Sequence, residues 1–281
     1  MKKVLILDGS TAEAFKHFNK KYEFTDLFCL NDEELVKEIH KKYILAGADV
    51  VTTNSFNANQ IYLEKNISSY DLSKKAAAIA KNAIQELKIN KKIYIAGAIG
   101  PSNIILSHNE DKNIFTKLKN SYLYQLEAFI ESDVDFILLE TFFDYKNIEL
   151  IFEVIDSIKN KINKVIIFSI TINEEGKIFS GENFLEIFKK FERDFVKVIG
   201  FNCGFGIKGM DKFLEQLKIF NKKIIFYPNV DSKKNYEKKF EEFSFYAENF
   251  LKKFDFYIFG SCCSTDFNYT KKIYEIINER K

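Results

Sequence analysis

Three of the four cysteines in this chain stand where together they could bind a soft metal ion. Cys262 and Cys263 are adjacent within Gly260-Ser-Cys-Cys-Ser-Thr265, and Cys203 lies within Gly200-Phe-Asn-Cys-Gly-Phe-Gly206. Adjacent cysteines seldom bond to each other, because disulfides join Cα atoms about 4.4 to 6.8 Å apart whereas one trans peptide holds neighbours about 3.8 Å apart. Zinc is the default ion, since catalytic zinc commonly has three protein ligands and one open position. The alternative is that these thiols are small buried apolar side chains.

Both cysteine segments follow short apolar runs. Phe254 to Phe259 precedes the adjacent pair, and Phe195 to Ile199 precedes Cys203. Short apolar runs bounded by glycine and polar residues are typical of buried strands. The three thiols are therefore expected at the carboxyl ends of two strands, where one metal ion could join them.

Short apolar runs alternate with longer helical patterns along the whole chain, which predicts a parallel sheet with crossover helices. Eight such units are the number that closes a (β/α)₈ barrel, also called a TIM barrel, and an open doubly wound sheet is the rival. No Pro-, Gly- or Ser-rich linker divides residues 1–281, so we expect a single α/β domain. The expected strands are residues 4–7, 49–53, 93–98, 135–139, 164–170, 195–199, 223–227 and 254–259, and the expected helices are residues 32–46, 68–87, 115–132, 145–158, 182–191, 210–220, 236–251 and 266–278.

Polar residues recur where these strands end, which is the functional face of a barrel. Glu140 follows a buried run, and a carboxylate there needs a cation, either a substrate group or a lysine. Asp8 could bind a substrate or cap a turn before Gly9. Asn54 and Asn202 could contact a ligand or simply support loop backbone.

Composition excludes several classes of protein. The 42 basic and 40 acidic residues leave a formal charge of +2, which gives no sign of a nucleic-acid partner. No segment approaches the roughly 18 uninterrupted apolar residues of a membrane span, and the apolar run after Met1-Lys-Lys is too short for a signal peptide. We therefore expect a cytoplasmic protein. Four cysteines in 281 residues favour thiol or metal chemistry over a disulfide framework.

With its segments taken in order, the chain resembles the homocysteine S-methyltransferase family over essentially its whole length. The spaced cysteine and adjacent cysteine pair within this series are the most specific part. The segments that carry the resemblance are Asp8-Gly9, Gly47-Ala-Asp-Val-Val-Thr-Thr-Asn-Ser-Phe56, Ala96 to Pro101, Leu138-Leu-Glu-Thr141, Phe168-Ser-Ile-Thr171 with Ser180-Gly181, Gly200 to Cys203, Tyr227-Pro-Asn229 and Gly260 to Cys263.

The resemblance implies a (β/α)₈ barrel in which Cys203, Cys262 and Cys263 bind Zn²⁺ and the sulfur of homocysteine takes the open position. Glu140 would receive the substrate's ammonium group, and Asp8 with the Gly9 backbone would help to hold the amino acid. The further expected substrate contacts are Asn54, Thr141 and Asn202. None of the three histidines, His17, His40 and His108, lies in a motif, so each is expected to be a surface or helix residue rather than a catalyst.

The resemblance also implies an enzyme of methionine biosynthesis that transfers a methyl group to homocysteine. A sulfonium donor, S-methylmethionine or S-adenosylmethionine, is our first choice because its positive sulfur is a good leaving group. Betaine comes second, and a separate methylcobalamin or methylfolate partner protein third. A catalytically inactive structural zinc barrel is the alternative from another class. The first loop lacks the family's second glycine, which leaves its path open. Residues 102–113 match the family poorly, which leaves the donor open, and the sequence does not decide whether the chain forms a homo-oligomer.

Overall fold

Eight parallel strands form one sheet in the computed structural model, which describes residues 4–18, 24–64 and 66–279. The strands are β1 (Leu5–Ile6), β2 (Val50–Thr52), β3 (Tyr94–Ile99), β4 (Phe136–Phe142), β5 (Val165–Ile170), β6 (Val196–Cys203), β7 (Lys223–Pro228) and β8 (Phe256–Phe259). From β2 to β8 each strand pairs with the next one in sequence, and β1 pairs with β8. The backbone of Asp8 donates a 3.0 Å hydrogen bond to Val50, which joins the end of β1 to β2. The predicted (β/α)₈ barrel is confirmed.

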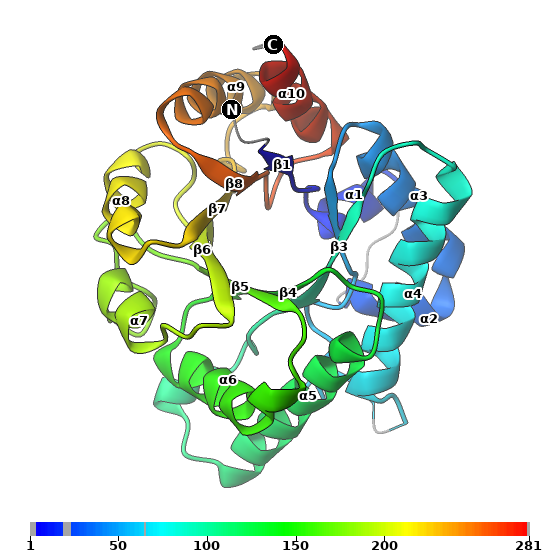
Figure 1. The fold of residues 1–281 in the computed structure, drawn as a ribbon, viewed down its shortest axis with the longest axis vertical. Helices are drawn as coiled ribbons and strands as arrows, with labels where there is room; N and C mark the ends of the chain where they lie inside the picture. Colours follow the sequence, from blue (N-terminus) through cyan, green and yellow to red (C-terminus); the bar gives the residue numbers. More distant parts are fainter. Residues whose placement is uncertain (1–3, 19–23, 65, 280–281) are drawn as a thin grey trace.

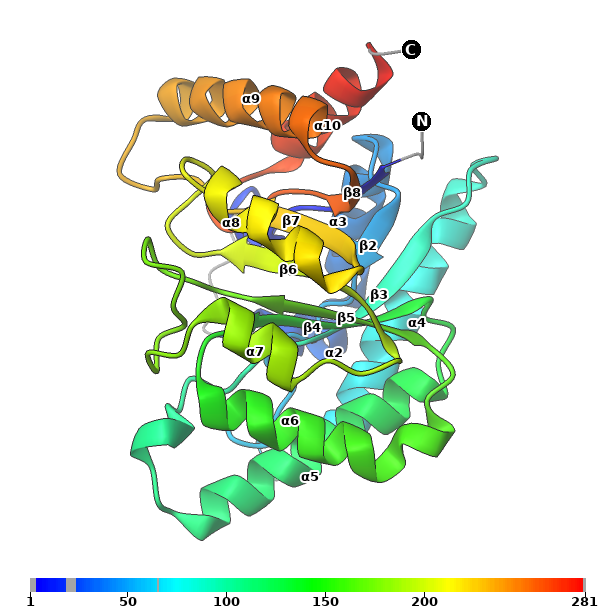
Figure 2. The ribbon, with the colours of Figure 1, turned by 60° about the vertical axis from the view of Figure 1, so that its left-hand side comes forward.

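Helices surround this ring of strands (Figure 1). The α-helices are α1 (Thr11–Lys16), α2 (Phe28–Asn31), α3 (Glu33–Leu45), α4 (Ser69–Leu87), α5 (Lys112–Ile130), α6 (Tyr145–Ile158), α7 (Phe184–Lys190), α8 (Asp211–Gln216), α9 (Tyr236–Lys253) and α10 (Phe267–Asn278). Figure 2 shows α9 beside α10 on one side of the barrel and α5 beside α6 on the opposite side. In the part of the chain that the structure describes, no helix is both long and apolar enough to cross a membrane.

Apolar side chains fill two layers. Inside the ring, alternate strand residues such as Leu138, Ile167 and Ile225 make a closed core, because successive strand side chains point to opposite faces. The other strand face packs against the helices through a larger cluster that includes Phe168 and Phe201. The strands are therefore buried on both faces, which holds their carboxyl ends at fixed positions.

Side-chain caps set several helix starts. The Asp111 carboxylate accepts from the Asn113 backbone at 2.8 Å, so α5 begins three residues before the expected Phe115. Asn183 caps α7 in the same way, and that helix begins after the expected residue 182. The helix expected over residues 210–220 is α8 followed by a 3₁₀ turn, Leu217–Phe220.

Two strands are longer than the sequence predicts. We expected the fourth and sixth strands to end at Leu139 and Ile199, but β4 continues through Phe142 and β6 through Cys203. Polar residues in these extensions resemble a loop in sequence, yet hydrogen bonds satisfy them inside the barrel mouth. The short helices α1 and α2 were not predicted at all.

His40 of α3 should make the fold sensitive to acid. Its ring is buried, and neither ring nitrogen has a hydrogen-bond partner among the described residues. Burial lowers the pKa of His40 to about 4, whereas an unfolded histidine has a pKa of about 6.5. Below about pH 6.5 the His40 ring binds a proton in the unfolded chain but stays neutral in the folded chain. We therefore expect the free energy of unfolding to fall by roughly 3 kcal/mol between pH 6.5 and pH 4 on this account.

Urea unfolding at a series of pH values tests this expectation. The variant His40→Leu should lose most of that fall, while His108→Gln, at an exposed histidine, should keep it. A pH dependence in His40→Leu equal to that of the wild type would contradict the assignment.

Candidate metal and substrate site

The three predicted thiols meet at the carboxyl end of the barrel. The Sγ atom of Cys203 lies 3.1 Å from that of Cys262 and 3.3 Å from that of Cys263, and the last two lie 3.9 Å apart. The fourth cysteine, Cys29, is buried elsewhere, with its thiol 3.3 Å from the carbonyl oxygen of Asn54. Cys262 lies 59 residues after Cys203, and the parallel pairing of β6, β7 and β8 brings the two segments to the same rim.

Backbone hydrogen bonds fix the adjacent pair against the end of β7. The Cys262 N–H donates to the Pro228 carbonyl at 2.9 Å, and the Cys263 carbonyl accepts from the Val230 N–H at 3.3 Å. Cys203 itself has a left-handed backbone with φ of 53°. Such conformations cost roughly 1–3 kcal/mol in residues other than glycine and are concentrated at functional sites.

The chemistry of this cysteine cluster fits a metal cation. Hydrogen bonds from Cys203 and Cys262 lower the pKa of the Cys263 thiol to about 3, whereas the hydrogen bonds of Cys262 with Cys203 and Cys263 raise the pKa of Cys262. One thiolate therefore forms easily and the next does not, unless a cation offsets the added charge. Tetrahedral zinc, with bonds of about 2.3 Å to sulfur, spaces its sulfur ligands about 3.8 Å apart, so the thiols would need to open by less than about 1 Å. Nearby, the buried Oδ1 atom of Asn229 has no hydrogen-bond partner among the described residues.

A cavity of about 410 Å³ opens beside the cluster, and we call it the barrel cavity. All three cysteines line it, together with Asp8 and Glu140. Within the described chain no histidine lines the cavity or joins the cysteine group. The cavity thus combines thiol ligands on one wall with carboxylates on another.

Glu140 projects into this cavity from β4. Its Oε2 atom accepts a 3.0 Å hydrogen bond from the Tyr227 hydroxyl of β7. Burial raises the pKa of Glu140 to about 7, although the Tyr227 hydrogen bond opposes the rise. No lysine or arginine pairs with Glu140 in the part of the chain that is described, so the salt bridge considered from sequence does not form there. Glu140 therefore offers a partly desolvated acceptor to a cation that enters the cavity.

Asp8 lies at the end of β1 and is held by Thr52 of β2. The Thr52 backbone N–H donates to Asp8 Oδ2 at 2.8 Å, and the Thr52 hydroxyl donates to Oδ1 at 3.1 Å. Burial raises the pKa of Asp8 well above its usual range, and the neighbouring charge of Glu140 raises it further. A buried carboxyl group whose ionisation is further disfavoured by a neighbouring carboxylate makes a site where a substrate ammonium group would be stabilised.

The remaining predicted residues divide between the cavity wall and its support. Gly9, Asn54 and Thr141 line the cavity, but the Asn54 side chain donates to the Thr25 carbonyl at 2.8 Å and so also anchors a loop. Asn202 does not line the cavity. Its Oδ1 accepts from the Thr141 N–H at 2.9 Å, and its Nδ2 donates to the Thr141 hydroxyl at 2.7 Å. Asn202 thereby holds Thr141, whose φ is 61°, beside Glu140.

Sequence reasoning did not select Tyr227 or Thr52 as site residues. Both lie inside the quoted motifs, but an apolar strand containing tyrosine or threonine is also the pattern of an ordinary core strand. The predicted residue Gly9 packs against Tyr43: a Cβ atom at Gly9 would lie 2.9 Å from the Tyr43 hydroxyl oxygen, so a larger residue would not fit there without a shift. The signal for Thr52 is its position on the strand next to the end of β1, where Asp8 lies, whereas Tyr227 lies three strands from β4 and reaches Glu140 across the inside of the barrel.

The fold and the site together are those of a (β/α)₈-barrel enzyme with a cysteine cluster at the carboxyl ends of its strands. The family model described as homocysteine S-methyltransferase matches residues 5–277. The chain belongs to the homocysteine S-methyltransferase family, and the protein is accordingly an enzyme of the methyltransferase class.

Solved structures show the same fold. The oxidised form of the homocysteine methyltransferase MmuM from Escherichia coli superposes with a TM-score of 0.79 at 19% identity, over 100% of this chain and 97% of that one. The metallated form of MmuM gives a TM-score of 0.78 at 18% identity, over 98% and 96% of the two chains. A methyltransferase from Methanosarcina mazei gives 0.62 at 9% identity, over 100% and 95%. At these low sequence identities, the structural likeness shows a shared fold alone.

Proposed function

We propose that this protein is a zinc-dependent methyltransferase that converts L-homocysteine to L-methionine with a sulfonium methyl donor. The observation that carries the proposal is the convergence of Cys203, Cys262 and Cys263 on a cavity that also contains Glu140 and Asp8. The family membership and the structural likeness to E. coli MmuM support homocysteine as the acceptor.

The three cysteines would hold the ion. When bound, zinc keeps a coordinated acceptor thiol in its thiolate form at neutral pH, so no separate general base is needed. Glu140 receives the ammonium group of homocysteine, and Asp8 supports the same amino acid from the opposite strand. Asn202 fixes Thr141 and with it the end of β4. The thiolate sulfur attacks the donor's methyl carbon, the bond from that carbon to the sulfonium sulfur breaks, and a neutral thioether leaves.

Two observations disfavour an inactive structural zinc protein. Structural zinc usually has four protein ligands, whereas the group of His, Cys, Asp and Glu side chains found among the described residues contains three. Glu140 also lies on the same cavity as the cysteines rather than away from them. We further propose that residues 1–281 form one homocysteine-binding domain.

Among donors, a sulfonium remains our first choice because it brings its own leaving group. Betaine and a methylcobalamin or methylfolate partner protein stay as the alternatives.

A donor panel tests the function. Purified protein loaded with zinc is incubated with homocysteine and, in separate reactions, S-methylmethionine, S-adenosylmethionine or betaine, and methionine is measured with and without a chelator. We expect methionine from a sulfonium donor and its loss with the chelator. Absence of methionine with every donor, or full activity in a metal-free preparation, would reject the proposal.

A further inference from the structure

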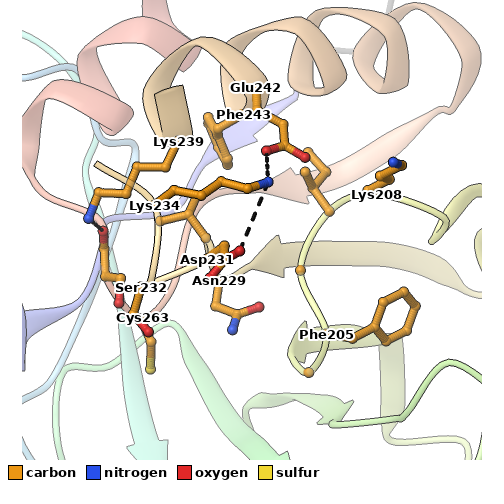
Figure 3. Close-up of a pocket in the computed structure, with 15 residues that line it drawn as sticks. Phe205, Lys208, Asn229, Asp231, Ser232, Lys234, Lys239, Glu242, Phe243 and Cys263 are labelled. Carbon is orange, nitrogen blue, oxygen red and sulfur yellow. Dashed lines mark hydrogen bonds and ion pairs between the residues drawn. The ribbon is translucent and has the colours of Figure 1, made fainter. Parts of the chain in front are cut away.

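A second cavity of about 440 Å³ lies on the other side of Cys263, and we call it the loop cavity (Figure 3). Its walls are the loop after β6, the loop after β7, the start of α9, and Cys263 with Ser264. Cys263 lines both cavities, so the two spaces meet at the cysteine cluster. A molecule in the loop cavity could therefore reach the sulfur atoms without entering the barrel cavity.

The loop after β6 presents hydrogen-bond donors. Gly204, Gly206 and Gly209 all have positive φ, between 77° and 99°. No backbone N–H of residues 205–209 donates a hydrogen bond to another described residue. Consecutive free N–H groups in such turns form concave sites that bind anions. Asn229 lines the same cavity, and its buried Oδ1 atom has no hydrogen-bond partner among the described residues. That oxygen is an acceptor, so the side-chain NH₂ group is the part of Asn229 that can donate to an anion.

Charge in the loop cavity favours an anion. Three lysines and two carboxylates line it. Figure 3 shows Lys234 joined to both carboxylates, Glu242 and Asp231. Lys239 donates to the Ser264 carbonyl at 3.0 Å and has no carboxylate partner within the described chain, and Lys208 has no partner at all there. In Figure 3 Lys208 lies on the side of the loop cavity away from Cys263 and supplies an unpaired positive charge there, whereas Lys239 lies beside Ser264, the residue after Cys263.

We propose that the loop cavity binds the α-carboxylate of the methyl donor, so that the donor's sulfonium lies beside the cysteine cluster while homocysteine occupies the barrel cavity. This inference rests on the proposed function. A methionine-derived sulfonium carries its positive sulfur and its carboxylate at opposite ends, which matches the separation between the cysteine cluster and the unpaired Lys208 in Figure 3. Its apolar methylene chain would pass over Val230 and Phe243, which are buried wall residues of the loop cavity.

Replacing Lys208 tests the proposed contact between the donor's carboxylate and the loop cavity. It is exposed and unpaired in the described structure, so Lys208→Ala should fold normally. Lys212→Ala is the matched control, because Lys212 lies four residues further on, bonds to the Glu174 carbonyl at 3.0 Å and does not line the cavity. Both variants change the net charge of the protein by the same amount.

Calorimetric titration measures donor binding directly, in zinc-loaded protein without homocysteine. We expect the Kd for S-methylmethionine to rise roughly five- to tenfold in Lys208→Ala and to stay within about twofold in Lys212→Ala, since a charged hydrogen bond at an accessible site contributes modestly. S-Methylmethionine carboxamide, which lacks the carboxylate, should bind wild type and Lys208→Ala alike. A donor that does not bind the wild type, or a carboxamide that loses as much affinity as the acid, would overturn the inference.

Steady-state kinetics separates this inference from the proposed function. In Lys208→Ala the KM for S-methylmethionine should rise by the same factor while the KM for homocysteine stays within about twofold. If the donor instead lies against Phe56 and Phe143 at the barrel cavity, Phe143→Ala would raise the donor KM and Lys208→Ala would not, which overturns the inference but leaves the function standing. Absence of turnover by the wild type rejects the function, whereas the titration still decides the carboxylate site.

Discussion

Replacement of Cys262 by serine is expected to remove zinc binding and methyl transfer together. The Cys262 thiol lies within 3.1 Å and 3.9 Å of the other two, and a hydroxyl in its place is a far poorer ligand for a soft ion. Structural zinc sites bind with about 10–16 kcal/mol over four ligands. Loss of one thiolate should therefore weaken zinc affinity by roughly 100- to 1,000-fold, and turnover should fall at least as far. Zinc per chain by mass spectrometry and methionine formation would be measured on the same samples.

Cys29→Ser is the matched control for that experiment. Cys29 is fully buried, and a serine hydroxyl there can still donate to the Asn54 carbonyl. We expect this variant to keep one zinc per chain and most of its activity. A Cys262→Ser protein that retains the wild-type zinc content and turnover would show that the cluster is not the metal site.

Replacement of Glu140 by glutamine should raise the KM for homocysteine roughly 100-fold, because it removes the buried carboxylate that we assign to the substrate ammonium group. Loss of one partner from a buried charge pair costs about 2–5 kcal/mol. Since burial raises the pKa of Glu140 to about 7, the wild-type enzyme should lose kcat/KM as the pH falls below about 7 and the carboxylate becomes protonated. Glu140→Gln should lose that acidic limb. The measurement is kcat/KM for homocysteine between pH 5.5 and pH 8.5.

Tyr227→Phe provides a contrast to Glu140→Gln. It keeps the Glu140 carboxylate but removes the hydrogen bond that holds the pKa of Glu140 down. We therefore expect the acidic limb to persist and to move to higher pH, with a smaller loss of kcat/KM. A homocysteine KM that is unchanged in Glu140→Gln would exclude Glu140 from substrate binding.

The sequence was sufficient to predict how the thiols meet. Eight alternating units predict the barrel, and the barrel places the ends of β6 and β8 on one rim, so Cys203 and the adjacent pair had to lie on the same face. This argument depends on strand order and on apolar runs, which are local properties of the chain. It does not depend on the exact side-chain packing.

The sequence was not sufficient to predict how the polar residues are supported. Glu140 and Thr141 resembled a loop because charged and polar residues rarely continue a buried strand. The structure shows why they can, since Tyr227 and Asn202 come from strands that are distant in sequence to satisfy them. Those partners are fixed only by the register of neighbouring strands. Asn202 illustrates the consequence, because we expected a substrate contact and the structure places it behind the cavity wall.

The loop cavity was missed for a related reason. Glycines at residues 204, 206 and 209 are in sequence typical of an ordinary turn, and their positive φ angles agree with a turn. The sequence does not show which way the free N–H groups point. It also does not show that Lys234 forms ion pairs with both Asp231 and Glu242. Both depend on how the loops after β6 and β7 pack together.

The most direct test of the account is X-ray absorption at the zinc edge, recorded before and after selenohomocysteine is added to the zinc-loaded protein. We predict three sulfur neighbours around zinc in the substrate-free protein and a new selenium neighbour when the substrate analogue is bound. Zinc without three sulfur neighbours, or a zinc shell that gains no selenium at saturating selenohomocysteine, would contradict the claim that Cys203, Cys262 and Cys263 hold an ion with a place for the acceptor sulfur.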